Sequence, residues 1–329
     1  MKPLLDVRDL KVHFPLASGQ TVHAVDGVTF SVNEGDSFGI VGESGSGKST
    51  TAQALMRLVD PVAGTMQLEK HDLSSLDGEP LRTIRHMMQM VFQDPYSSLN
   101  PRLRAGQAVR EPLDLMGLGP VRGRENRVDE MFRQVGLHPD AKRLFPHQFS
   151  GGQRQRLCIA RAMVTEPRLI VCDEPVSALD VAIQAQILNL LKRLQKDKRL
   201  TYVFISHDLA VVQHICTHVA VMYLGEFVEQ APTGQLFAAA KHPYTWSLMA
   251  AALSPDDRSR AGARFTVTGE PPSPINPPKA CRFAGRCPFA TDRCRTEKPA
   301  LRDFGNGHRV ACHYAGELTP PLPELAATA

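Results

Sequence analysis

Residues 42–49 constrain this chain more than any other part of its sequence. They read GESGSGKS and fit the pattern G-x-x-x-x-G-K-[ST] at every position. A short apolar run at residues 37–41 precedes the motif, and residues 50–59 carry apolar side chains at helical spacing. A strand, a glycine-rich turn and a helix N-terminus together form a cradle for phosphate groups. The motif therefore predicts a nucleoside triphosphate site.

Each position of this motif has an expected role. Lys48 should neutralise the β- and γ-phosphates, and the Ser49 hydroxyl should ligate Mg²⁺. Backbone N–H groups of the loop and of the first helical turn should surround the phosphates, which makes the following residues ATP-binding candidates: Gly42, Glu43, Ser44, Gly45, Ser46, Gly47 and Thr50.

The composition narrows the class of protein. Charged residues make up 22% and hydrophobic residues 43% of 329 residues, as in ordinary globular domains. The formal net charge of +4 comes without a dense basic block, so no nucleic-acid partner is expected. No stretch approaches the roughly 18 apolar residues that a membrane span needs. Asp6 and Asp9 in the first residues argue against a signal peptide, so we expect a cytoplasmic location.

The hydrophobic pattern predicts an α/β fold. Residues 4–14 and 22–32 alternate apolar and polar side chains, as in half-buried strands. Buried strands are expected at 169–172 and 202–205, on either side of a helix over 181–196, which indicates a parallel sheet. Residues 219–228 should close this unit around a turn at Gly225. Residues 94–156, which precede the strand expected at 169–172, have a helical pattern that is broken at Pro101, Pro112 and Pro139.

Two adjacent acids end the apolar run at 169–172. Asp173 at the strand tip can hold Mg²⁺ through water, and Glu174 can act as general base toward the attacking water. A solvated acidic turn would be the alternative, but the phosphate motif upstream favours the catalytic interpretation.

Residues 149–153, FSGGQ, decide between phosphate-loop families. Here the chain resembles the ATP-binding-cassette (ABC) family, whose signature is LSGGQ, with Phe149 in place of Leu. The resemblance implies that the signature faces the ATP of a partner subunit, as does the D-loop at 177–180, so that these residues would bind ATP in trans: Ser150, Gly151, Gly152, Gln153 and Asp180.

Further family elements follow in order along the chain. Gln93 matches the Q-loop, which contacts Mg²⁺, and His207 matches the switch histidine, which contacts the γ-phosphate. Phe14 matches the aromatic residue that stacks on adenine, although it could also be a core residue. The resemblance implies a competent ATPase with Glu174, His207 and Lys48 as catalytic residues, and Mg²⁺ held through Ser49, Gln93 and Asp173.

The resemblance also implies an architecture. We expect an ABC-type P-loop NTPase at 4–231, with a RecA-like core, an antiparallel β subdomain and a helical signature subdomain at about 94–160. The segments 242–245 and 269–278 resemble the C-terminal extension of oligopeptide and dipeptide transporter ATPases, in particular of the second ATPase subunit. This extension should cover 232–316, and a disordered tail should follow at 317–329.

Four of the seven cysteines crowd into the extension: Cys281, Cys287, Cys294 and Cys312. Their spacing, C-x5-C-x6-C-x17-C, lacks the close pairs usual for zinc and is compatible with a four-thiolate [4Fe–4S] cluster. Members of the resembled family carry such a cluster there, which favours iron–sulfur over zinc or no metal. His308 and His313 could replace a ligand but are expected to be surface residues. Cys158, Cys172 and Cys216 have apolar neighbours and should lie in the core.

The function expected from the resemblance is that of an ATP-hydrolysing subunit of an importer of dipeptides or oligopeptides. Its partners would be a second ABC ATPase, giving a heterodimer, two transmembrane permeases and an extracytoplasmic peptide-binding protein, with the chain peripheral on the cytoplasmic face of the inner membrane. Related importers carry nickel, antimicrobial peptides or glutathione, so the cargo stays open. The alternatives are an ABC ATPase acting on nucleic acid or ribosomes, or an unrelated P-loop kinase.

Overall fold

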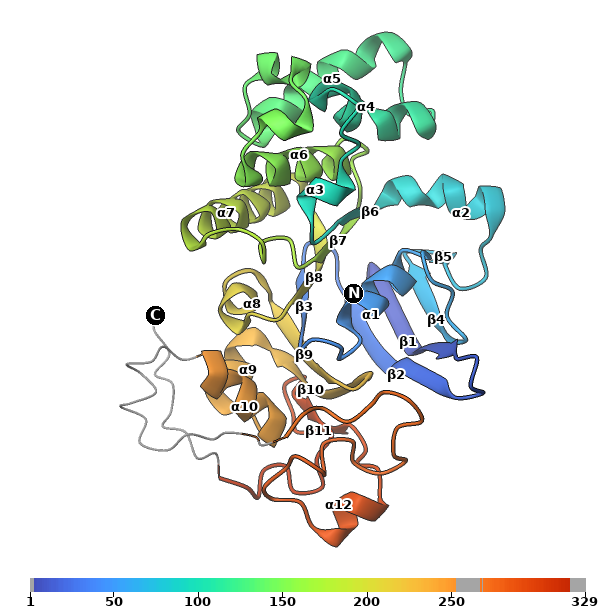
Figure 1. Cartoon of the computed structure of the whole chain (residues 1–329), viewed down its shortest axis with the longest axis vertical. Helices are drawn as coiled ribbons and strands as arrows, with labels where there is room; N and C mark the ends of the chain where they lie inside the picture. The colour runs from blue at the N-terminus through green and yellow to red at the C-terminus, as the bar shows by residue number, and fades with distance from the viewer. Residues whose placement is uncertain (1–2, 253–266, 268, 320–329) are drawn as a thin grey trace. The chain divides into compact units, whose positions relative to one another are not determined.

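The structure, a computed structural model, describes residues 3–252, 267 and 269–319 (Figure 1). The chain divides into two compact units that are each assembled from several segments. The first unit comprises Met1–Leu5, Val32–Asp36 and Gln67–Ile205, and the second comprises Asp6–Ser31, Ser37–Met66 and Ser206–Ala329. From residue 320 onward, the tail that we expected to be disordered lies outside the described residues.

The first unit contains a parallel sheet. Strand β7 (Leu169–Asp173) lies between β6 (Met88–Val91) and β8 (Thr201–Ser206), and both neighbours run parallel to it. Every residue of β7 and β8 is buried, as the continuous apolar runs predict for a sheet covered on both faces. The helix α7 (Val181–Lys198) follows β7 in sequence and buries one apolar stripe. The expected parallel sheet is thereby confirmed.

Helices make up the rest of this unit, and the 94–160 region is helical as predicted. Apolar stripes bring α4 (Ala105–Leu115) against α5 (Val121–Gln134) and α6 (Gly151–Met163). The prediction of a break at Pro112 is wrong, because this proline lies inside α4. It stands in the last turn, where its missing N–H removes one i→i−4 hydrogen bond, and α4 ends three residues later. The smaller helices are α2 (Gly78–Ile84), α3 (Pro95–Ser98), and the 3₁₀ turns η1 (Arg85–Met87), η2 (Pro139–Arg143) and η3 (Pro146–Gln148).

The second unit contains the first two predicted strands, β1 (Leu5–Pro15) and β2 (Thr21–Val32), with β1 between β2 and β4 (Ala63–Leu68). A short strand, β5 (His71–Asp72), pairs antiparallel with the end of β4. The strand β3 (Ser37–Val41) runs parallel to β9 (His218–Tyr223), and β10 (Glu226–Pro232) pairs antiparallel with β9. The turn at Gly225 is therefore confirmed.

Helix α1 (Lys48–Leu55) begins inside the phosphate motif and ends earlier than the 50–59 pattern predicts. Arg57 adopts a left-handed backbone with φ of 50°, which ends the helix before Val59. The Arg57 side chain is buried and binds Asp60 at 3.1 Å, so the chain turns away where the sequence pattern suggested another helical turn.

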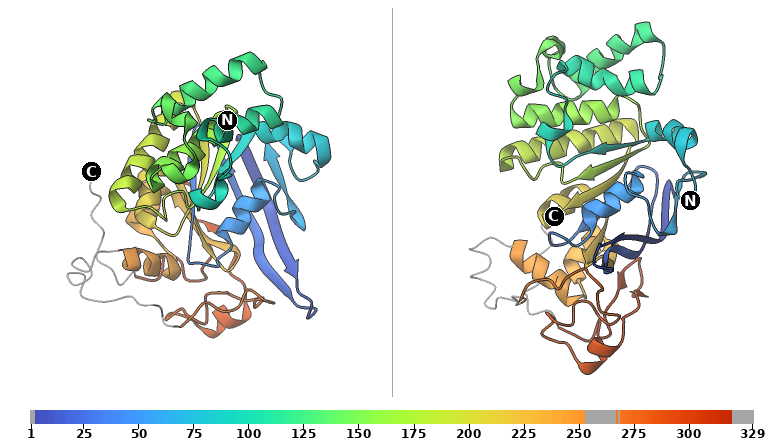
Figure 2. Two further views of the ribbon diagram at one scale, coloured as in Figure 1. Left: turned by 45° about the horizontal axis from the view of Figure 1, so that its top comes forward. Right: turned by 45° about the vertical axis from the view of Figure 1, so that its right-hand side comes forward.

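The C-terminal extension of the second unit adds to the same sheet (Figure 2). Strand β12 (Arg309–Val310) pairs antiparallel with β10 and with β11 (Arg302–Asp303). The extension contains α9 (Thr233–Ala239), α10 (Pro243–Ala252) and α12 (Asp292–Thr296), whereas α8 (Leu209–Ile215) precedes it. His308 just before β12 is fully buried, with its Nε2 2.7 Å from the carboxylate of Glu229. The expectation of a surface histidine at 308 is therefore wrong, since Glu229 offers it a buried partner.

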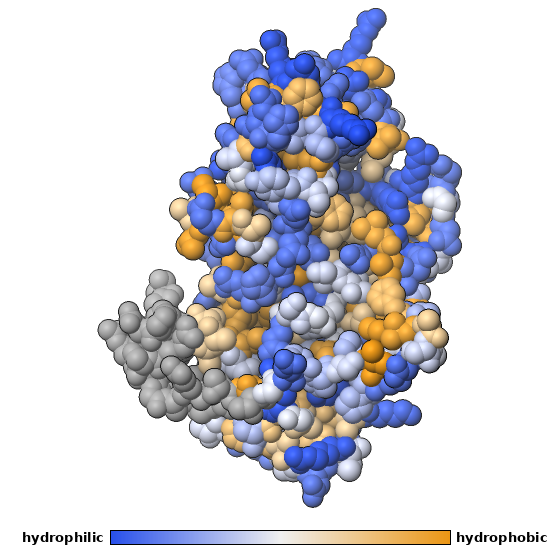
Figure 3. All heavy atoms as spheres, in the orientation of Figure 1, coloured by the Kyte–Doolittle hydropathy of each residue, from blue (hydrophilic) through white to orange (hydrophobic). Residues whose placement is uncertain are grey.

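Polar and apolar side chains are distributed as the composition of an ordinary globular domain predicts. The face drawn in Figure 3 is mostly hydrophilic, with apolar side chains in small scattered groups. Among the described residues, no helix combines the length and the apolar character that crossing a membrane would require. Cys158, Cys172 and Cys216 are buried, as predicted.

Candidate functional site

The phosphate loop, residues 42–49, joins β3 to α1 in the second unit, and its glycines are required by close backbone contacts. A Cβ atom on Gly47 would lie 2.1 Å from the main-chain oxygen of Ala24, and Gly47 has a φ of 107°. A Cβ on Gly42 would lie 2.2 Å from the main-chain oxygen of Met222. Neither position accepts a side chain, so the motif's first and last glycines are fixed by packing as well as by turn geometry.

Lys48 is fixed inside this loop. Its Nζ donates hydrogen bonds to the main-chain oxygens of Gly42 at 2.9 Å and Glu43 at 2.8 Å, and the residue is only 5% exposed. Ser49 and Thr50 stand half-buried in the first turn of α1. The ammonium charge and the helix N-terminus add their positive potentials at one place, which is the electrostatic requirement for a phosphate site.

Two other candidates also belong to the second unit. Phe14 near the end of β1 is 39% exposed, so it is not a core residue and presents its ring to solvent. His207 follows β8 and is exposed, immediately before Asp208, whose carboxylate caps α8 by accepting a hydrogen bond from the Ala210 N–H at 2.8 Å. The cap fixes the backbone next to His207 while leaving the imidazole at the surface.

In the first unit the structure brings together the predicted Q-loop residue and the predicted base. Gln93 follows β6 and Glu174 follows β7, and parallel neighbours end at the same sheet edge. Gln93 Nε2 donates to Glu174 Oε2 over 3.1 Å. Glu174 has a left-handed backbone with φ of 46°, held by its N–H donating to the Ile205 oxygen at 3.0 Å. Such strain in a non-glycine residue is typical of functional positions.

Asp173 precedes this pair at the tip of β7 and is 6% exposed. A buried carboxylate at a strand end, with the Gln93 amide from the neighbouring strand's loop close to the next residue, supplies the oxygen ligands that Mg²⁺ prefers. The donor types at Asp173, Gln93 and Ser49 therefore fit the ion that accompanies ATP.

The signature residues form the N-terminus of α6. Ser150 is the N-cap: its Oγ accepts from the Gln153 N–H at 3.3 Å, and Gln153 Oε1 accepts from the Ser150 N–H at 3.0 Å. Ser150 and Gln153 are exposed, whereas Gly152 is buried and a Cβ there would lie 2.6 Å from the Ile183 side chain. The signature therefore presents a polar helix terminus, with one glycine required for packing.

The D-loop candidate Asp180 has a structural role that the motif did not predict. Its Oδ1 accepts from the Ile183 N–H at 3.0 Å and caps α7. The residue is exposed, so this cap leaves its second carboxylate oxygen at the surface.

Sequence reasoning missed two residues that contact the phosphate loop from the extension. Tyr244 Oη accepts from the Glu43 N–H at 2.8 Å, and Arg286 binds the Glu43 carboxylate through both terminal nitrogens, at 2.8 and 3.1 Å. Tyr244 was noted only as part of a family motif, and no spacing pattern could have paired Arg286 with a residue 243 positions earlier.

The four cysteines of the extension line one pocket, and each of them lies within the described residues. They share it with His242, Phe283 and His313. Cys294 is buried and the other three are half-buried. Cys281 N–H donates to the Cys294 oxygen at 3.1 Å, which ties the two chain segments together.

The distances between the sulfurs of these cysteines argue against a single zinc ion. No three of them lie within 4.8 Å of one another, whereas one zinc ion with Zn–S bonds of about 2.3 Å would require closer sulfurs. Burial, together with neighbouring thiolates, raises the pKa of Cys281 to about 12 and that of Cys287 to about 11. The thiols are thus protonated at neutral pH, and a bound cationic centre would offset the cost of ionising them.

The chain is similar to known proteins over almost its whole length. Residues 25–177 match the family described as ABC transporter, and residues 228–294 match the oligopeptide/dipeptide transporter C-terminal region. The probable peptide ABC transporter ATP-binding protein y4tS of Sinorhizobium fredii is 51% identical over 316 residues, covering 94% of this chain and 89% of that protein. The oligopeptide transport ATP-binding protein AppF of Bacillus subtilis is 46% identical over 320 residues, covering 94% and 97%.

Solved structures agree with this match. The dimeric, post-hydrolysis ATP-binding cassette MJ0796 bound to ADP and Pi shares 29% identity, with a TM-score of 0.64, over 70% of this chain and 98% of that one. CbiO1 of Clostridium perfringens, part of the ABC transporter complex CbiONQ, shares 28% identity, with a TM-score of 0.65, over 72% and 92%.

Proposed function

This chain belongs to the ATP-binding proteins of ABC transporters that carry the oligopeptide/dipeptide C-terminal region, and on that premise we propose that it drives the import of dipeptides or oligopeptides by hydrolysing ATP. The proposal rests on one observation: this chain carries both an ATPase cassette and that C-terminal region. Two relatives are named as peptide or oligopeptide transport ATP-binding proteins, which supports peptides as the cargo.

We assign ATP binding to the phosphate loop. Its backbone N–H groups and the buried Lys48 ammonium would bind the β- and γ-phosphates, and the exposed ring of Phe14 would stack on adenine. Ser49, Gln93 and Asp173 would hold Mg²⁺, which neutralises charge on the phosphates when it is bound. The proposed contacts of the loop with ATP are completed by Glu43, Ser44, Gly45, Ser46, Gly47 and Thr50.

Hydrolysis is assigned to Glu174 as general base, positioned by its hydrogen bond from Gln93. The hydrogen bond from the Gln93 amide holds the Glu174 carboxylate in a fixed orientation. His207, exposed after β8, would contact the γ-phosphate.

We infer that the site is completed by a partner ATPase. The Ser150–Gln153 helix terminus is exposed and offers N–H groups and a hydroxyl suited to a phosphate, and the signature would reach the partner's ATP together with Gly151, Gly152 and Asp180. The related cassette MJ0796 is dimeric, which supports such pairing. The partner here would be a second ATPase subunit, giving a heterodimer.

A peptide importer ATPase works with permease and substrate-binding subunits. We propose that two transmembrane permeases hold this chain peripherally on the cytoplasmic face of the inner membrane, and that an extracytoplasmic binding protein delivers the peptide. ATP-driven closure and opening of the two cassettes would move the permeases. The cassette would cover residues 4–231 and the extension 232–316.

We propose that Cys281, Cys287, Cys294 and Cys312 hold a [4Fe–4S] cluster with a structural role. The pocket that the four cysteines share supports this assignment. Anaerobically purified protein should contain about four iron atoms and show iron–sulfur absorbance, and Cys294→Ser should lower both while Cys158→Ser should not. Zinc in place of iron, or no metal in an anaerobic preparation, would contradict the cluster.

Peptide transport is tested in proteoliposomes containing this chain with its two permeases and partner ATPase. Uptake of a radiolabelled tripeptide should require ATP on the side of the ATPases and the binding protein on the other. A non-hydrolysable ATP analogue should support no net uptake. Uptake that is equal with ATP and with the analogue, or ATP turnover that responds to nucleic acid and not to the binding protein, would refute the proposal.

A further inference from the structure

The phosphate loop contains one acidic residue, Glu43, and the extension holds it by its side chain. Both terminal nitrogens of Arg286 bind the Glu43 carboxylate, in the two-bond geometry that is specific to arginine. The Arg286 side chain is 10% exposed and that of Glu43 is 31% exposed, so water screens this pair less than a surface pair. Burial lowers the pKa of Arg286, but the hydrogen bonds and charge of Glu43 outweigh it and raise this pKa further above its usual range.

The main chain of Glu43 is held from the same side. Tyr244 Oη accepts the Glu43 N–H, and the Tyr244 residue is fully buried. Its ring centroid lies 4.7 Å from that of Tyr223 and 5.4 Å from that of Phe283. An aromatic cluster thus connects the second residue of the phosphate loop to the segment that bears Arg286.

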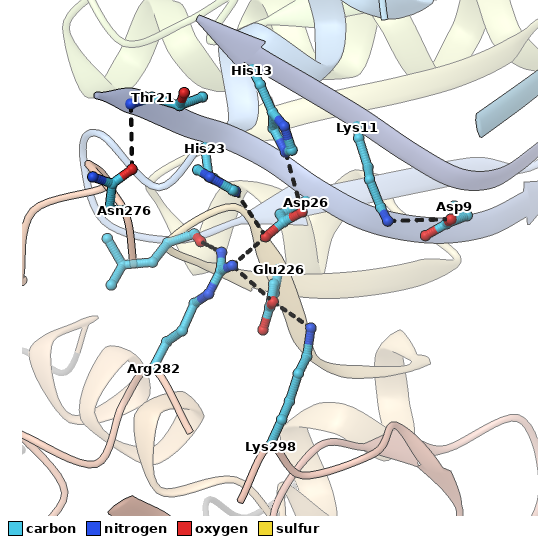
Figure 4. A network of polar contacts seen from close by, with 11 residues as sticks. Asp9, Lys11, His13, Thr21, His23, Asp26, Glu226, Asn276, Arg282 and Lys298 are labelled. Atoms are coloured by element: carbon cyan, nitrogen blue, oxygen red, sulfur yellow. Dashed lines mark hydrogen bonds and ion pairs between the residues drawn. The ribbon is translucent and has the colours of Figure 1, made fainter. Parts of the chain in front are cut away.

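That segment is a short turn, residues 281–287, which we call the docking turn. Arg282 anchors it to the core of the second unit by bonding Asp26 on β2, the Leu224 oxygen and, at 3.1 Å, Glu226 on β10 (Figure 4). Lys298 reaches Glu226 at 2.6 Å from the other side. The docking turn is therefore fixed at one flank by the buried Arg282 and at the other by the half-buried Arg286.

Two of the four clustered cysteines form the ends of the docking turn. Cys281 directly precedes Arg282, and Cys287 directly follows Arg286. The Ala284 N–H donates to the Cys281 oxygen, and the Cys287 N–H donates to the Phe283 oxygen, each at 3.0 Å. Whatever fixes the cysteine side chains therefore also fixes the backbone from which Arg286 extends.

We propose that Arg286 is a positioning residue for the phosphate loop, and that through it the cysteine-bearing docking turn sets the nucleotide affinity of the cassette. The inference rests on the proposed function, because it concerns ATP binding at residues 42–49. Arg286 acts in two ways. It neutralises a carboxylate in a loop that must receive a polyanion, and it holds the loop backbone with Tyr244.

The coupling is reciprocal, because binding free energies are linked. If an ordered docking turn strengthens nucleotide binding, bound nucleotide must in turn order the docking turn. Deuterium exchange at the hydrogen-bonded N–H groups of Ala284 and Cys287 should therefore slow when MgATP is present. This readout does not depend on ATP turnover.

The direct test is a fluorescence titration of the full chain with a labelled MgATP analogue. Arg286→Ala should weaken binding of the analogue about fivefold or more. The affinity of Arg286→Lys should lie between those of Arg286→Ala and the wild type, because one ammonium group replaces only part of the two-bond contact that the guanidinium makes. Arg293→Ala, an exposed arginine paired with Glu297 in the same extension, is the matched control and should bind like the wild type. Circular dichroism confirms that each variant is folded.

A double-mutant cycle separates the effect of the unpaired Glu43 charge on nucleotide affinity from a general loss of structure. Adding Glu43→Ala to Arg286→Ala removes the unpaired carboxylate and should restore part of the lost affinity. Cys287→Ser should weaken binding in the same direction, and its effect should not add to that of Arg286→Ala. The inference is overturned if Arg286→Ala binds like the wild type, if the cycle is additive, or if Cys287→Ser leaves the affinity unchanged. Failure of the wild type itself to bind the analogue would instead refute the proposed function.

Discussion

The phosphate loop and the cysteine pocket are the two ligand sites that we propose in the second unit, and they are built in opposite ways. The loop uses eight consecutive residues, two glycines in close backbone contact, and a lysine bonded to the loop's own oxygens. The pocket collects four side chains spread over 32 sequence positions, and tertiary contacts bring them together. A local site can be predicted from sequence because its geometry is encoded in adjacent residues, whereas a dispersed site depends on the fold around it.

Glu43 connects the phosphate loop to the segment that bears two of the pocket's cysteines, because it binds Arg286. The loop's own contacts fix Lys48, but the Glu43 side chain is fixed only with the help of Arg286 beside Cys287. The comparison therefore predicts that changes inside the loop have the largest effects, and that changes in its supports have smaller ones.

The largest effect is expected from Lys48→Ala. Removing a buried charge that contacts the phosphates should lower ATP affinity or turnover by about 100-fold or more. Equilibrium nucleotide titration and turnover in the assembled transporter measure both. Lys196→Ala on the exposed end of α7 is the control. Equal nucleotide affinity and turnover in the two variants would show that the loop is not the nucleotide site.

Gly47→Ala tests whether the loop's geometry is intrinsic. Its Cβ would lie 2.1 Å from the Ala24 oxygen at a φ of 107°, so the free energy of unfolding should fall by at least about 2 kcal/mol. Gly234→Ala, in α9 with no atom within 4 Å of its Cβ, should instead stabilise by up to about 1 kcal/mol. Denaturant unfolding of both variants measures the difference. Similar stabilities would mean that the loop tolerates a displaced backbone.

Asp26→Asn tests the anchor of the docking turn. Burial raises the pKa of Asp26, but Arg282, His13 and His23 together lower it to about 2. Since the pKa of Asp26 in the folded state lies below its ordinary value of 3.8, the stabilisation is complete above pH 3.8 and is lost as the pH falls through about 2.

After discounting for solvent screening, Asp26→Asn should lower the free energy of unfolding at pH 7 by about 1–2 kcal/mol. The difference from the wild type should shrink toward pH 2. Asp9→Asn, with an exposed carboxylate, is the control. A difference that stays constant from pH 7 to pH 2 would show that charge pairing with Arg282 is not the cause.

These contrasts also explain which features could be predicted. The parallel pairing of β7 with β8 followed from two apolar runs, and the phosphate motif fixed both β3 and the start of α1, whereas β6 was not predicted. The end of α1 could not be predicted, because Arg57 has a left-handed backbone and its buried side chain binds the exposed carboxylate of Asp60. The break expected at Pro112 was wrong, because α4 continues through it to Leu115 at the cost of one backbone hydrogen bond.

The candidate site shows the same division. Gln93 and Glu174 were both proposed from motifs, and the parallel pairing of β6 with β7 brings their side chains to 3.1 Å. The Glu43–Arg286 pair, the buried His308–Glu229 pair and the Asp180 cap each depend on contacts that no local pattern encodes.

The central claim, that this chain hydrolyses ATP with Glu174 as base, is tested most directly by Glu174→Gln in the assembled transporter. The isosteric amide cannot accept the proton, so turnover should fall by about 100-fold or more while nucleotide affinity is kept. ATP should then remain bound and unhydrolysed in this chain's site, as recovery of labelled ATP from the isolated complex would show. Turnover equal to that of the wild type, with ADP in the site, would contradict the account.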